Sequence, residues 1–205
     1  MNLFVIGATG HTGKQIIDLA LARPHQVTAF VRSPHRITPR DSNLTIIRGD
    51  PHDVEQLARE VRGHDAVLSA LGVRPPQAFR PHTLVEECAA STVAAMSTAG
   101  VSRLVLVSVA ILFPGKGLQY AFFRRLLKHI ARDLGRAEEI VKATPLDWTI
   151  VRPPRLTNGV DATYRAQPDA LPENGNSMSF RAVAAFMLDA VEKHSYSREV
   201  VGLAK

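Results

Sequence analysis

The sequence lacks the residues and patterns that mark several large classes of protein. Its 205 residues include a single cysteine, Cys88, which excludes an intramolecular disulfide framework. It contains no run of about 18 apolar residues, so no segment is expected to span a membrane. The first residues lack the cationic start and long apolar stretch of a secretory signal, and we therefore expect a cytoplasmic protein.

Clustered metal ligands and aromatic residues are also scarce. The 8 histidines are scattered, and neither an HExxH motif nor a cysteine cluster is present, so no metal site is expected. Aromatic residues make up 6% of the chain, which is few for stacking on bases, although the net charge is +6. We therefore expect neither a nucleic-acid nor a membrane partner, and the choice between monomer and homodimer stays open.

What the sequence does contain is an alternation of short apolar runs with longer helical patterns. Strands that are apolar on both faces and separated by helices predict a parallel sheet covered on both sides. The predicted class is α/β, a Rossmann-type doubly wound sheet in three layers. The expected strands cover residues 3–6, 26–31, 44–47, 65–69, 103–108 and 147–151, and the expected helices cover residues 11–22, 54–61, 81–99 and 117–143.

The C-terminal part departs from this alternation. Pro153 and Pro154 interrupt it, and a segment rich in Pro, Gly and Asn covers residues 157–176. Ser179 then predicts the N-cap of a helix that ends at Glu192, and residues 199–203 predict a last strand. We expect one domain over residues 1–205, with residues 153–205 forming a small segment on the substrate side.

The strongest local signal is a glycine-rich loop between the first strand and the first helix. Glycines in this position let the backbone approach a pyrophosphate closely, and the helix N-terminus supplies free N–H groups. The spacing is GxxGxxG rather than the more common GxGxxG. The predicted cofactor contacts in this loop are Gly7, Thr9, Gly10, His11, Thr12 and Gly13.

These features resemble a known family. The GATGHTG loop at residues 7–13, Leu71-Gly72, Ser108 and the TIVRPP segment at residues 149–154 look like the atypical short-chain dehydrogenase/reductases. Within them the chain is most similar to small NAD(P)H-binding proteins of the NmrA-like and flavin (biliverdin) reductase type. The resemblance covers nearly the whole chain and implies a dinucleotide cofactor, but it does not specify a substrate.

The residues after the second strand favour NADP(H) over NAD(H). An NAD site needs a carboxylate near this position for the ribose hydroxyls, whereas an arginine accommodates a 2′-phosphate. No Asp or Glu occurs between Leu19 and Arg40. Arg32 and Ser33 are therefore predicted to hold the phosphate, and Arg36 is a further candidate. For Arg36 and Arg40 the alternative is a solvated loop. The same span also contains Arg23.

Further cofactor contacts follow from the resemblance alone. It implies that Asp50 meets the adenine amino group, although a helix cap is the alternative. It also implies that Ala70, Leu71 and Gly72 pass under the ribose and pyrophosphate, and that Pro153 lines the nicotinamide pocket. Arg74 could close over the phosphates or could be an ordinary loop cation.

The catalytic residues are less well defined than the cofactor loop. Typical short-chain dehydrogenases use a serine and a YxxxK dyad, and this chain has no YxxxK. The family pattern around Arg136 would place the dyad near Ile130 and Leu134, which have no acid–base chemistry. Ser108 matches the family serine and could bond the carboxamide, the substrate or only a strand end. Tyr120 is the remaining candidate acid.

The missing dyad limits the reaction that can be expected. Conjugated acceptors such as flavins and quinones need less help with a proton than ketones do, so orientation over the nicotinamide can suffice. We therefore expect an NADPH-dependent oxidoreductase acting on a small flavin-like or quinone-like acceptor. The alternatives are a non-catalytic NADP-binding regulator of the NmrA-like type and, ranked last, an NAD(P)-dependent epimerase or isomerase.

One helix pattern remains without an assigned role. Four cations recur every four residues, at Arg124, Lys128, Arg132 and Arg136, and predict a single basic stripe. The stripe could bind an acidic protein, a nucleic acid or a flavin phosphate, or it could be a solvated face. The apolar pairs at residues 122–123 and 126–127 on the same helix are expected to lie in the core.

Overall fold

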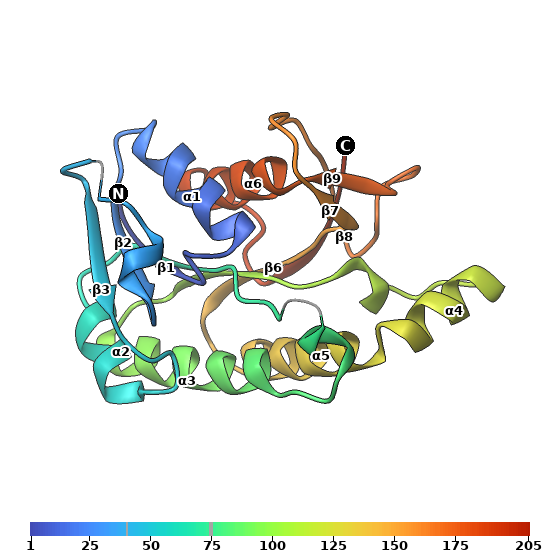
Figure 1. The fold of residues 1–205 in the computed structure, drawn as a ribbon, viewed down its shortest axis with the longest axis horizontal. Coiled ribbons are helices and arrows are strands. Elements are labelled where there is room, and N and C mark those ends of the chain that lie inside the picture. Colours follow the sequence, from blue (N-terminus) through green and yellow to red (C-terminus); the bar gives the residue numbers. More distant parts are fainter. Residues whose placement is uncertain (40, 74–75) are drawn as a thin grey trace.

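A mixed eight-stranded sheet crosses the centre of the protein, with helices on both faces (Figure 1). The computed structural model describes residues 1–39, 41–73 and 76–205. The strands are ordered β3-β2-β1-β4-β5-β6-β10-β8, and all but β8 run parallel to their neighbours. Their bounds are β1 (Asn2–Ile6), β2 (Gln26–Val31), β3 (Leu44–Arg48), β4 (Ala66–Ser69), β5 (Arg103–Val107), β6 (Asp147–Arg152), β8 (Arg165–Pro168) and β10 (Glu199–Ala204).

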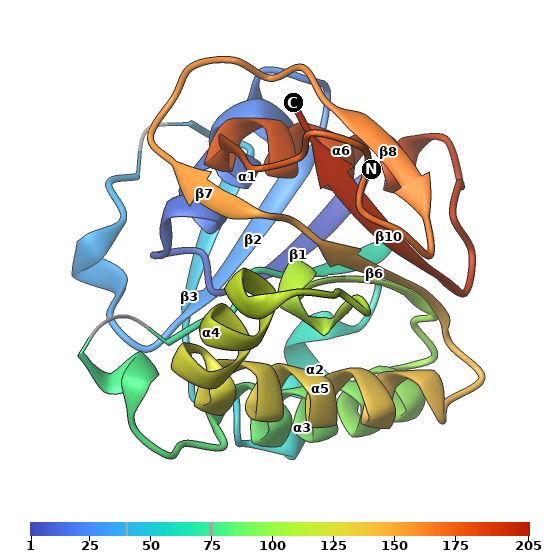
Figure 2. The same cartoon turned by 90° about the vertical axis from the view of Figure 1, so that its right-hand side faces the viewer.

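The helices form two layers, so the doubly wound three-layer α/β fold is confirmed. Figure 2 shows α1 (His11–Leu21) and α6 (Phe180–Glu192) above the sheet. Below it lie α2 (Val54–Val61), α3 (Leu84–Ala99) and α5 (Lys128–Lys142). Side chains of a strand alternate between faces. Leu3 and Val5 therefore enter the core cluster with α1 and α6, whereas Phe4 and Ile6 enter the other.

Local sequence signals account for several helix ends. The Asp53 carboxylate accepts a hydrogen bond of 2.9 Å from the Gln56 backbone N–H and caps α2. The Ser179 hydroxyl accepts one of 2.8 Å from the Ala182 N–H and caps α6, as the sequence predicted. Helix α3 ends at Gly100, whose φ of +74° is the left-handed conformation that favours glycine.

The boundaries of two helices differ from the sequence prediction. Helix α3 begins at Leu84 rather than at residue 81, because the Asp133 side chain of α5 holds its first backbone N–H groups. The predicted helix over residues 117–143 is two helices, α4 (Leu118–Leu126) and α5, divided at Leu127. A 3₁₀ turn, η3 (Ala110–Leu112), precedes α4.

The C-terminal part contains short strands that the sequence did not predict. Strand β7 (Arg155–Thr157) pairs in parallel with β9 (Ser177–Ser179), outside the main sheet. Strand β8 lies within the Pro/Gly/Asn-rich segment and pairs antiparallel with β10 at the sheet edge. Three- and four-residue strands carry too few side chains for an alternating pattern, which explains why they were missed.

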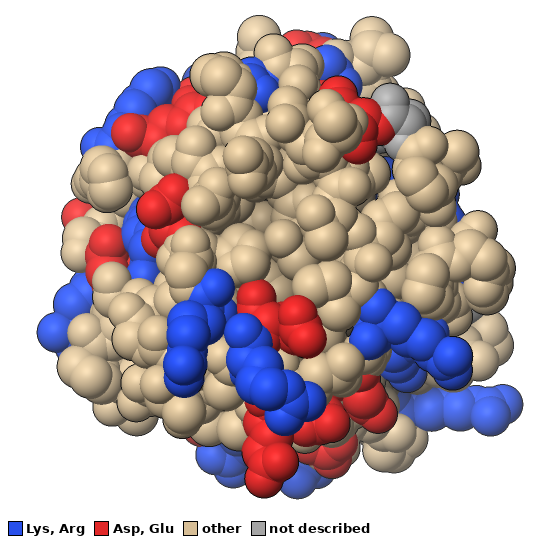
Figure 3. Space-filling view, turned by 90° about the vertical axis from the view of Figure 1, so that its left-hand side faces the viewer, with Lys and Arg blue, Asp and Glu red and all other residues tan. Residues whose placement is uncertain are grey.

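Not every side of the molecule carries an excess of positive charge. Figure 3 views the side opposite α4, where an uncharged centre is bordered by both Lys/Arg and Asp/Glu side chains.

Among the described residues, no helix has the length and apolar character needed to cross a bilayer.

Candidate functional site

The predicted cofactor residues lie along one edge of the sheet, at the carboxyl ends of its parallel strands. Strands β1, β2 and β3 follow one another toward one edge of the sheet, and β4, β5 and β6 follow one another toward the other edge. The order in which strands are added therefore reverses between β1 and β4. Ligands of doubly wound sheets bind at such a crevice. The residues that follow the strands here are Gly7 (β1), Arg32 (β2), Asp50 (β3), Ala70 (β4), Ser108 (β5) and Pro153 (β6).

The glycine loop between β1 and α1 is packed so tightly that Gly7 and Gly13 leave no room for a side chain. Gly7 has a φ of +80°, and a Cβ atom there would lie 2.7 Å from the carbonyl carbon of Ala70. A Cβ at Gly13 would lie 2.3 Å from the Gly7 carbonyl oxygen. The Gly10 N–H donates to that same oxygen at 2.9 Å. These contacts leave a backbone cradle at the crevice, which fits the pyrophosphate of a dinucleotide.

The first turn of α1 completes the cradle. Gly10 is its N-cap, and no acidic residue occupies the first turn. The first N–H groups of a helix have no partner within the helix, and they attract an anion. The Thr12 side chain is buried, and the His11 ring stacks on Phe180 at a centroid distance of 4.8 Å. His11 therefore joins the cradle to α6, and the surface offered to a phosphate is mostly backbone.

The ends of β2 and β3 bring Arg32 and Asp50 close together. Val31 pairs with Arg48, and the Gly49 N–H donates to the Val31 carbonyl at 3.0 Å. Arg32 is exposed, and it is one of the charges that lower the pKa of Asp50. Hydrogen bonds from the His52 backbone and ring, at 3.0 and 2.8 Å, contribute most to that lowering.

Asp50 does not cap α2, which was the alternative to its contact with adenine. The cap of α2 is Asp53, whereas Asp50 fixes the turn at His52. The His52 Nε2 atom lies 3.7 Å from the Sγ of Cys88, which is fully buried on α3. Burial raises the pKa of the Cys88 thiol to about 12. The loop after β3 is thereby held against the helix layer below it.

Not all cations of the acid-free stretch belong to this site. Arg23 pairs with Asp189 at 2.8 Å and with Glu192 at 2.7 Å, both on α6. Arg23 therefore does not contribute to a phosphate site, because carboxylates from a helix distant in sequence neutralise it. Arg36 is exposed in the 3₁₀ turn η1 (Pro34–Arg36), directly after Ser33. Arg40 and Arg74 lie outside the described residues.

A buried network surrounds Ser108 at the end of β5. The Ser108 hydroxyl donates to the Oε1 of Glu138 on α5 at 2.6 Å. Arg152, at the end of β6, donates to both oxygens of the same carboxylate at 2.9 and 2.6 Å. Lys142 adds a contact of 3.0 Å. Glu138 therefore ties the two strand ends to each other and to the helix layer.

The ionisation of Glu138 depends on these partners. Burial alone would raise the pKa of its carboxyl group, but the hydrogen bonds from Arg152 and Ser108 outweigh burial and lower the pKa. The carboxylate is therefore charged at neutral pH. It keeps the Ser108 hydrogen pointing toward itself and leaves the lone pairs of that oxygen as acceptors.

Backbone contacts extend the same support to Pro153. The Ser108 N–H donates to the Val151 carbonyl at 2.7 Å, and the Ala110 N–H donates to the Pro153 carbonyl at 2.9 Å. On the other side, the Ala70 N–H donates to the Ile6 carbonyl at 2.9 Å, so the 70–72 segment passes directly beside Gly7. Gly7, Ala70, Ser108 and Pro153 thus lie at the same edge of the sheet.

Tyr120 lies in a different setting from Ser108. Its hydroxyl donates toward the carbonyls of Ile111 and Phe113, at 3.3 and 3.0 Å, and accepts from Arg124 at 3.2 Å. These bonds join α4 to the η3 turn.

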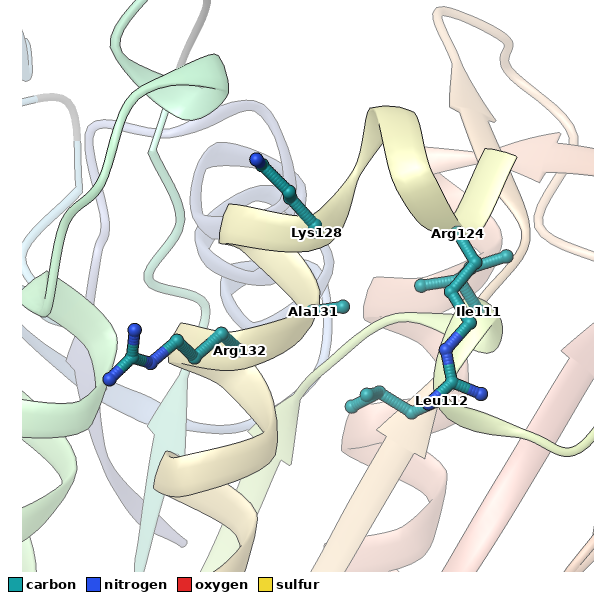
Figure 4. A pocket seen from close by; sticks show the side chains of 6 residues that line it. All are labelled: Ile111, Leu112, Arg124, Lys128, Ala131 and Arg132. Atoms are coloured by element: carbon teal, nitrogen blue, oxygen red, sulfur yellow. The ribbon is translucent and has the colours of Figure 1, made fainter. Parts of the chain in front are cut away.

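The basic stripe predicted from residue 124 to residue 136 is wrong as a single helical face. The chain bends at Leu127, and Arg136 pairs with Glu139 at 2.7 Å. The other three cations line a pocket of about 280 Å³ together with Ile111, Leu112 and Ala131. Figure 4 shows the Arg124 side chain beside η3, with Lys128 and Arg132 extending away from it. Their charges are spread along the rim.

The prediction that residues 122–123 and 126–127 pack in the core is also wrong. Phe122, Phe123 and Leu126 are exposed, and α4 contains no buried residue. An apolar spacing shows which residues share a helix face, but it does not show what covers that face.

Two buried carboxylates were not recognised in the sequence. The sequence analysis assigned no role to Glu138 and Asp133, yet they are 2% and 1% exposed. A usable signal was their place among apolar α5 residues: Leu134, Ala137 and Val141 occupy the same buried face. A carboxylate on an apolar face needs a partner, and here the partners come from other elements.

Comparison with known proteins agrees with this geometry. The sequence model of the NAD(P)H-binding family matches residues 7–194. An uncharacterized chloroplastic protein of Arabidopsis thaliana is 34% identical over 169 residues, covering 77% of this chain and 60% of that protein. An uncharacterized sugar epimerase of Bacillus subtilis, YhfK, is 27% identical over 77% of this chain and 73% of its own length.

Solved structures show the same architecture. The crystal structure of the oxidoreductase ylbE from Lactococcus lactis has a TM-score of 0.85 to this chain at 21% identity, over 100% of this chain and 91% of the other. At that identity the likeness concerns the fold. This chain spans less than two thirds of the Arabidopsis relative, so the activity of that longer protein is not transferred to it.

Proposed function

The chain belongs to the NAD(P)H-binding family, and from that premise we propose that it is an NADPH-dependent oxidoreductase acting on a conjugated acceptor such as a flavin or quinone. Membership agrees with the resemblance to the atypical short-chain dehydrogenase/reductases. The observation that carries the proposal is a complete backbone cradle in a chain without the YxxxK dyad. A reaction that needs no proton donor on the protein fits this combination.

The cofactor contacts follow the strand ends. Gly7, Gly10 and Gly13, with the backbone of Thr9, His11 and Thr12, hold the pyrophosphate. Arg32, Ser33 and Arg36 hold the 2′-phosphate, and Asp50 holds the adenine amino group. Ala70, Leu71 and Gly72 line the ribose side, and Pro153 lines the nicotinamide side. NADPH bound here supplies the hydride.

The role of Ser108 is to orient the nicotinamide. Its hydrogen is given to the Glu138 carboxylate, so its oxygen offers lone pairs to an N–H donor such as the carboxamide. Ser108 is thus an acceptor in this proposal, not a source of protons. The Tyr120 hydrogen is given to main-chain carbonyls, which favours an acceptor that takes its proton from water.

The acceptor side is formed by η3, α4 and α5, together with residues 153–205 of the single domain. Ile111, Leu112 and Ala131 give the pocket an apolar floor, and Arg124 lies beside η3 at its rim. A flat apolar acceptor that carries a phosphate or carboxylate matches this lining. The expected acceptor is therefore anionic as well as conjugated.

Steady-state oxidation of NADPH, with FMN, riboflavin, a soluble quinone and biliverdin as acceptors, tests the proposal. We expect turnover with at least one of them, with NADPH preferred over NADH. Tight NADPH binding without turnover of any acceptor would contradict it. That outcome would favour the non-catalytic NADP-binding regulator, for which the engaged hydroxyls of Ser108 and Tyr120 are the supporting observation.

An epimerase that retains its cofactor is the remaining alternative, supported by the name of the Bacillus subtilis relative. Protein purified without added cofactor separates the two enzymes. Stoichiometric bound NADP(H) is expected of the epimerase, whereas the reductase must exchange its cofactor in every cycle. The cytoplasmic location, and a monomer or homodimer as the working form, stay predictions.

A further inference from the structure

Helix α4 presents an apolar strip to solvent. Leu118 is 91% exposed and Phe122 is 64% exposed, and Phe123 and Leu126 are 42% and 47% exposed. These four are among only seven large hydrophobic residues exposed in the described part of the chain. Large exposed apolar side chains that cluster on one element mark an interaction surface rather than chance exposure.

The attachment of α4 explains why this strip faces outward. A helix turns about 100° per residue, so Leu118, Phe122 and Leu126 share one side, with Phe123 beside it. Tyr120 and Arg124 lie on the opposite side, and Tyr120 is bonded to η3. The body of the protein therefore takes the polar side of α4. Figure 1 shows the helix projecting at one end of the molecule.

The residues that flank the strip in the sequence include cations and no carboxylate. Lys116, Arg125 and Lys128 lie in or next to α4, and all three are exposed. The chain has 19 acidic residues, yet none occurs in residues 88–132. The nearest carboxylate in the sequence, Asp133, is buried and holds the start of α3. An occupant of this surface must therefore be both apolar and anionic.

A second copy of the chain fits this requirement poorly. A two-fold contact through α4 would place the same surface on both sides and bring the cations of one copy against those of the other. Lys116 precedes α4, Arg125 lies within it and Lys128 follows it, so the exposed positive charge extends along the helix. Such a distribution suits an extended negatively charged surface.

We propose that α4 docks the protein on the surface of an anionic lipid bilayer. Leucine and phenylalanine side chains enter the boundary between head groups and acyl chains, while the neighbouring lysine and arginine side chains meet the anionic head groups. This contact needs no membrane-spanning segment, and it departs from the sequence-based expectation of no membrane partner. It also does not depend on the identity of the acceptor.

Sedimentation with vesicles tests the proposal on the full chain. Vesicles of phosphatidylcholine are compared with vesicles that also contain phosphatidylserine, at low and high salt. We expect the protein to sediment with the anionic vesicles and to be released by salt. Absence of binding to the anionic vesicles, or equal binding to both compositions, would overturn the proposal.

Variants show whether α4 is the element that binds. Replacing Phe122→Ser together with Leu126→Ser is expected to weaken vesicle binding by about tenfold, because apolar area is lost from the bilayer contact. The matched control is Val160→Ser, which removes an apolar side chain that is 91% exposed elsewhere. Unchanged binding by the double variant would refute the role of α4. NADPH affinity should be the same in all three proteins, which shows that they are folded.

Discussion

The two halves of the candidate site lie on the same edge of the sheet but are built in different ways. In the glycine loop, main-chain atoms approach so closely that a Cβ at Gly13 would lie 2.3 Å from a carbonyl oxygen. On the proposed acceptor side, α4 has no buried residue, and the side-chain hydrogen bonds described for it all involve Tyr120. The cofactor half therefore tolerates little change, whereas the acceptor half can vary without cost to the core.

The largest effect is expected in the cofactor half, from Gly13→Ala. The added methyl group would meet backbone atoms of Gly7 and Ala8, which cannot move without opening the loop. Overpacking of this kind costs about 1–3 kcal/mol, and if NADPH binding bears that cost its affinity falls by about 5- to 150-fold. Titration calorimetry with NADPH measures it.

Gly135→Ala is the matched control. A Cβ there would lie 3.7 Å from a Leu112 methyl group, an ordinary contact, and an alanine inside a helix is about 0.5–1 kcal/mol more stable than a glycine. Its NADPH affinity should equal that of the wild type. Equal affinities for Gly13→Ala and wild type would show that the cradle does not hold the cofactor.

The second effect concerns the network that joins the two halves. Glu138→Gln keeps the size of the side chain but leaves Arg152 and Lys142 without their carboxylate, and we expect a loss of about 2 kcal/mol in the free energy of unfolding. Urea unfolding measures it. The neighbouring Glu139→Gln removes a surface pair with Arg136 and should cost less than about 0.5 kcal/mol. Similar costs for the two variants would contradict the network.

The third effect compares a helix cap supplied by another helix with a local one. Asp133 accepts hydrogen bonds from the N–H groups of Val85 and Glu86 and lies 2.8 Å from His82. Asp133→Ala should cost about 1.5 kcal/mol, against about 1 kcal/mol for Asp53→Ala at the exposed cap of α2. Thermal unfolding ranks the two. A smaller cost at Asp133 would mean that α3 does not need a partner from α5.

The fourth effect concerns cofactor choice. Arg32→Asp places a carboxylate where the 2′-phosphate is expected, so NADPH binding should weaken about tenfold or 1.4 kcal/mol more than NADH binding. Arg62→Asp makes the same change in charge at the C-terminal end of α2, away from the strand ends, and serves as the control. Equal losses of both cofactors in Arg32→Asp would refute the phosphate assignment.

The smallest effect is a pH dependence. The pKa of Glu138 is lowered in the folded protein from its ordinary value of 4.5. Its contribution to stability is therefore fully present above pH 4.5 and is lost as the pH falls through the folded value. Unfolding measured from neutral to acid pH should show a shallower decline for Glu138→Gln than for the wild type. Parallel curves would show that Glu138 is not the titrating group.

The sequence predicted those parts of the site that depend on neighbouring residues. The glycine loop, the helix cap at Ser179 and the strand end at Val31 each depend on residues that are close together in the sequence. Each has a local physical cause: a close backbone approach, a hydroxyl that meets an N–H group, or a run of buried apolar side chains.

The sequence could not predict the parts that depend on contacts between distant elements. Ser108 meets Glu138 across 30 residues, and Arg23 meets Asp189 across 166. A charge pattern shows neither which carboxylate turns inward nor which cation it neutralises. The exposure of Phe122 has the same origin, because only the folded chain reveals that Tyr120, not the phenylalanine, is held against the body.

The burial of Cys88 has a practical consequence. It is the single thiol of the chain, it is fully buried on α3, and its pKa is raised to about 12. A thiol reagent can react with it only after the structure around Cys88 opens, for example where His52 covers the thiol. The labelling rate of Cys88 therefore measures how often this part of the structure opens. Comparing the rate with and without NADPH would show how strongly the cofactor suppresses that opening.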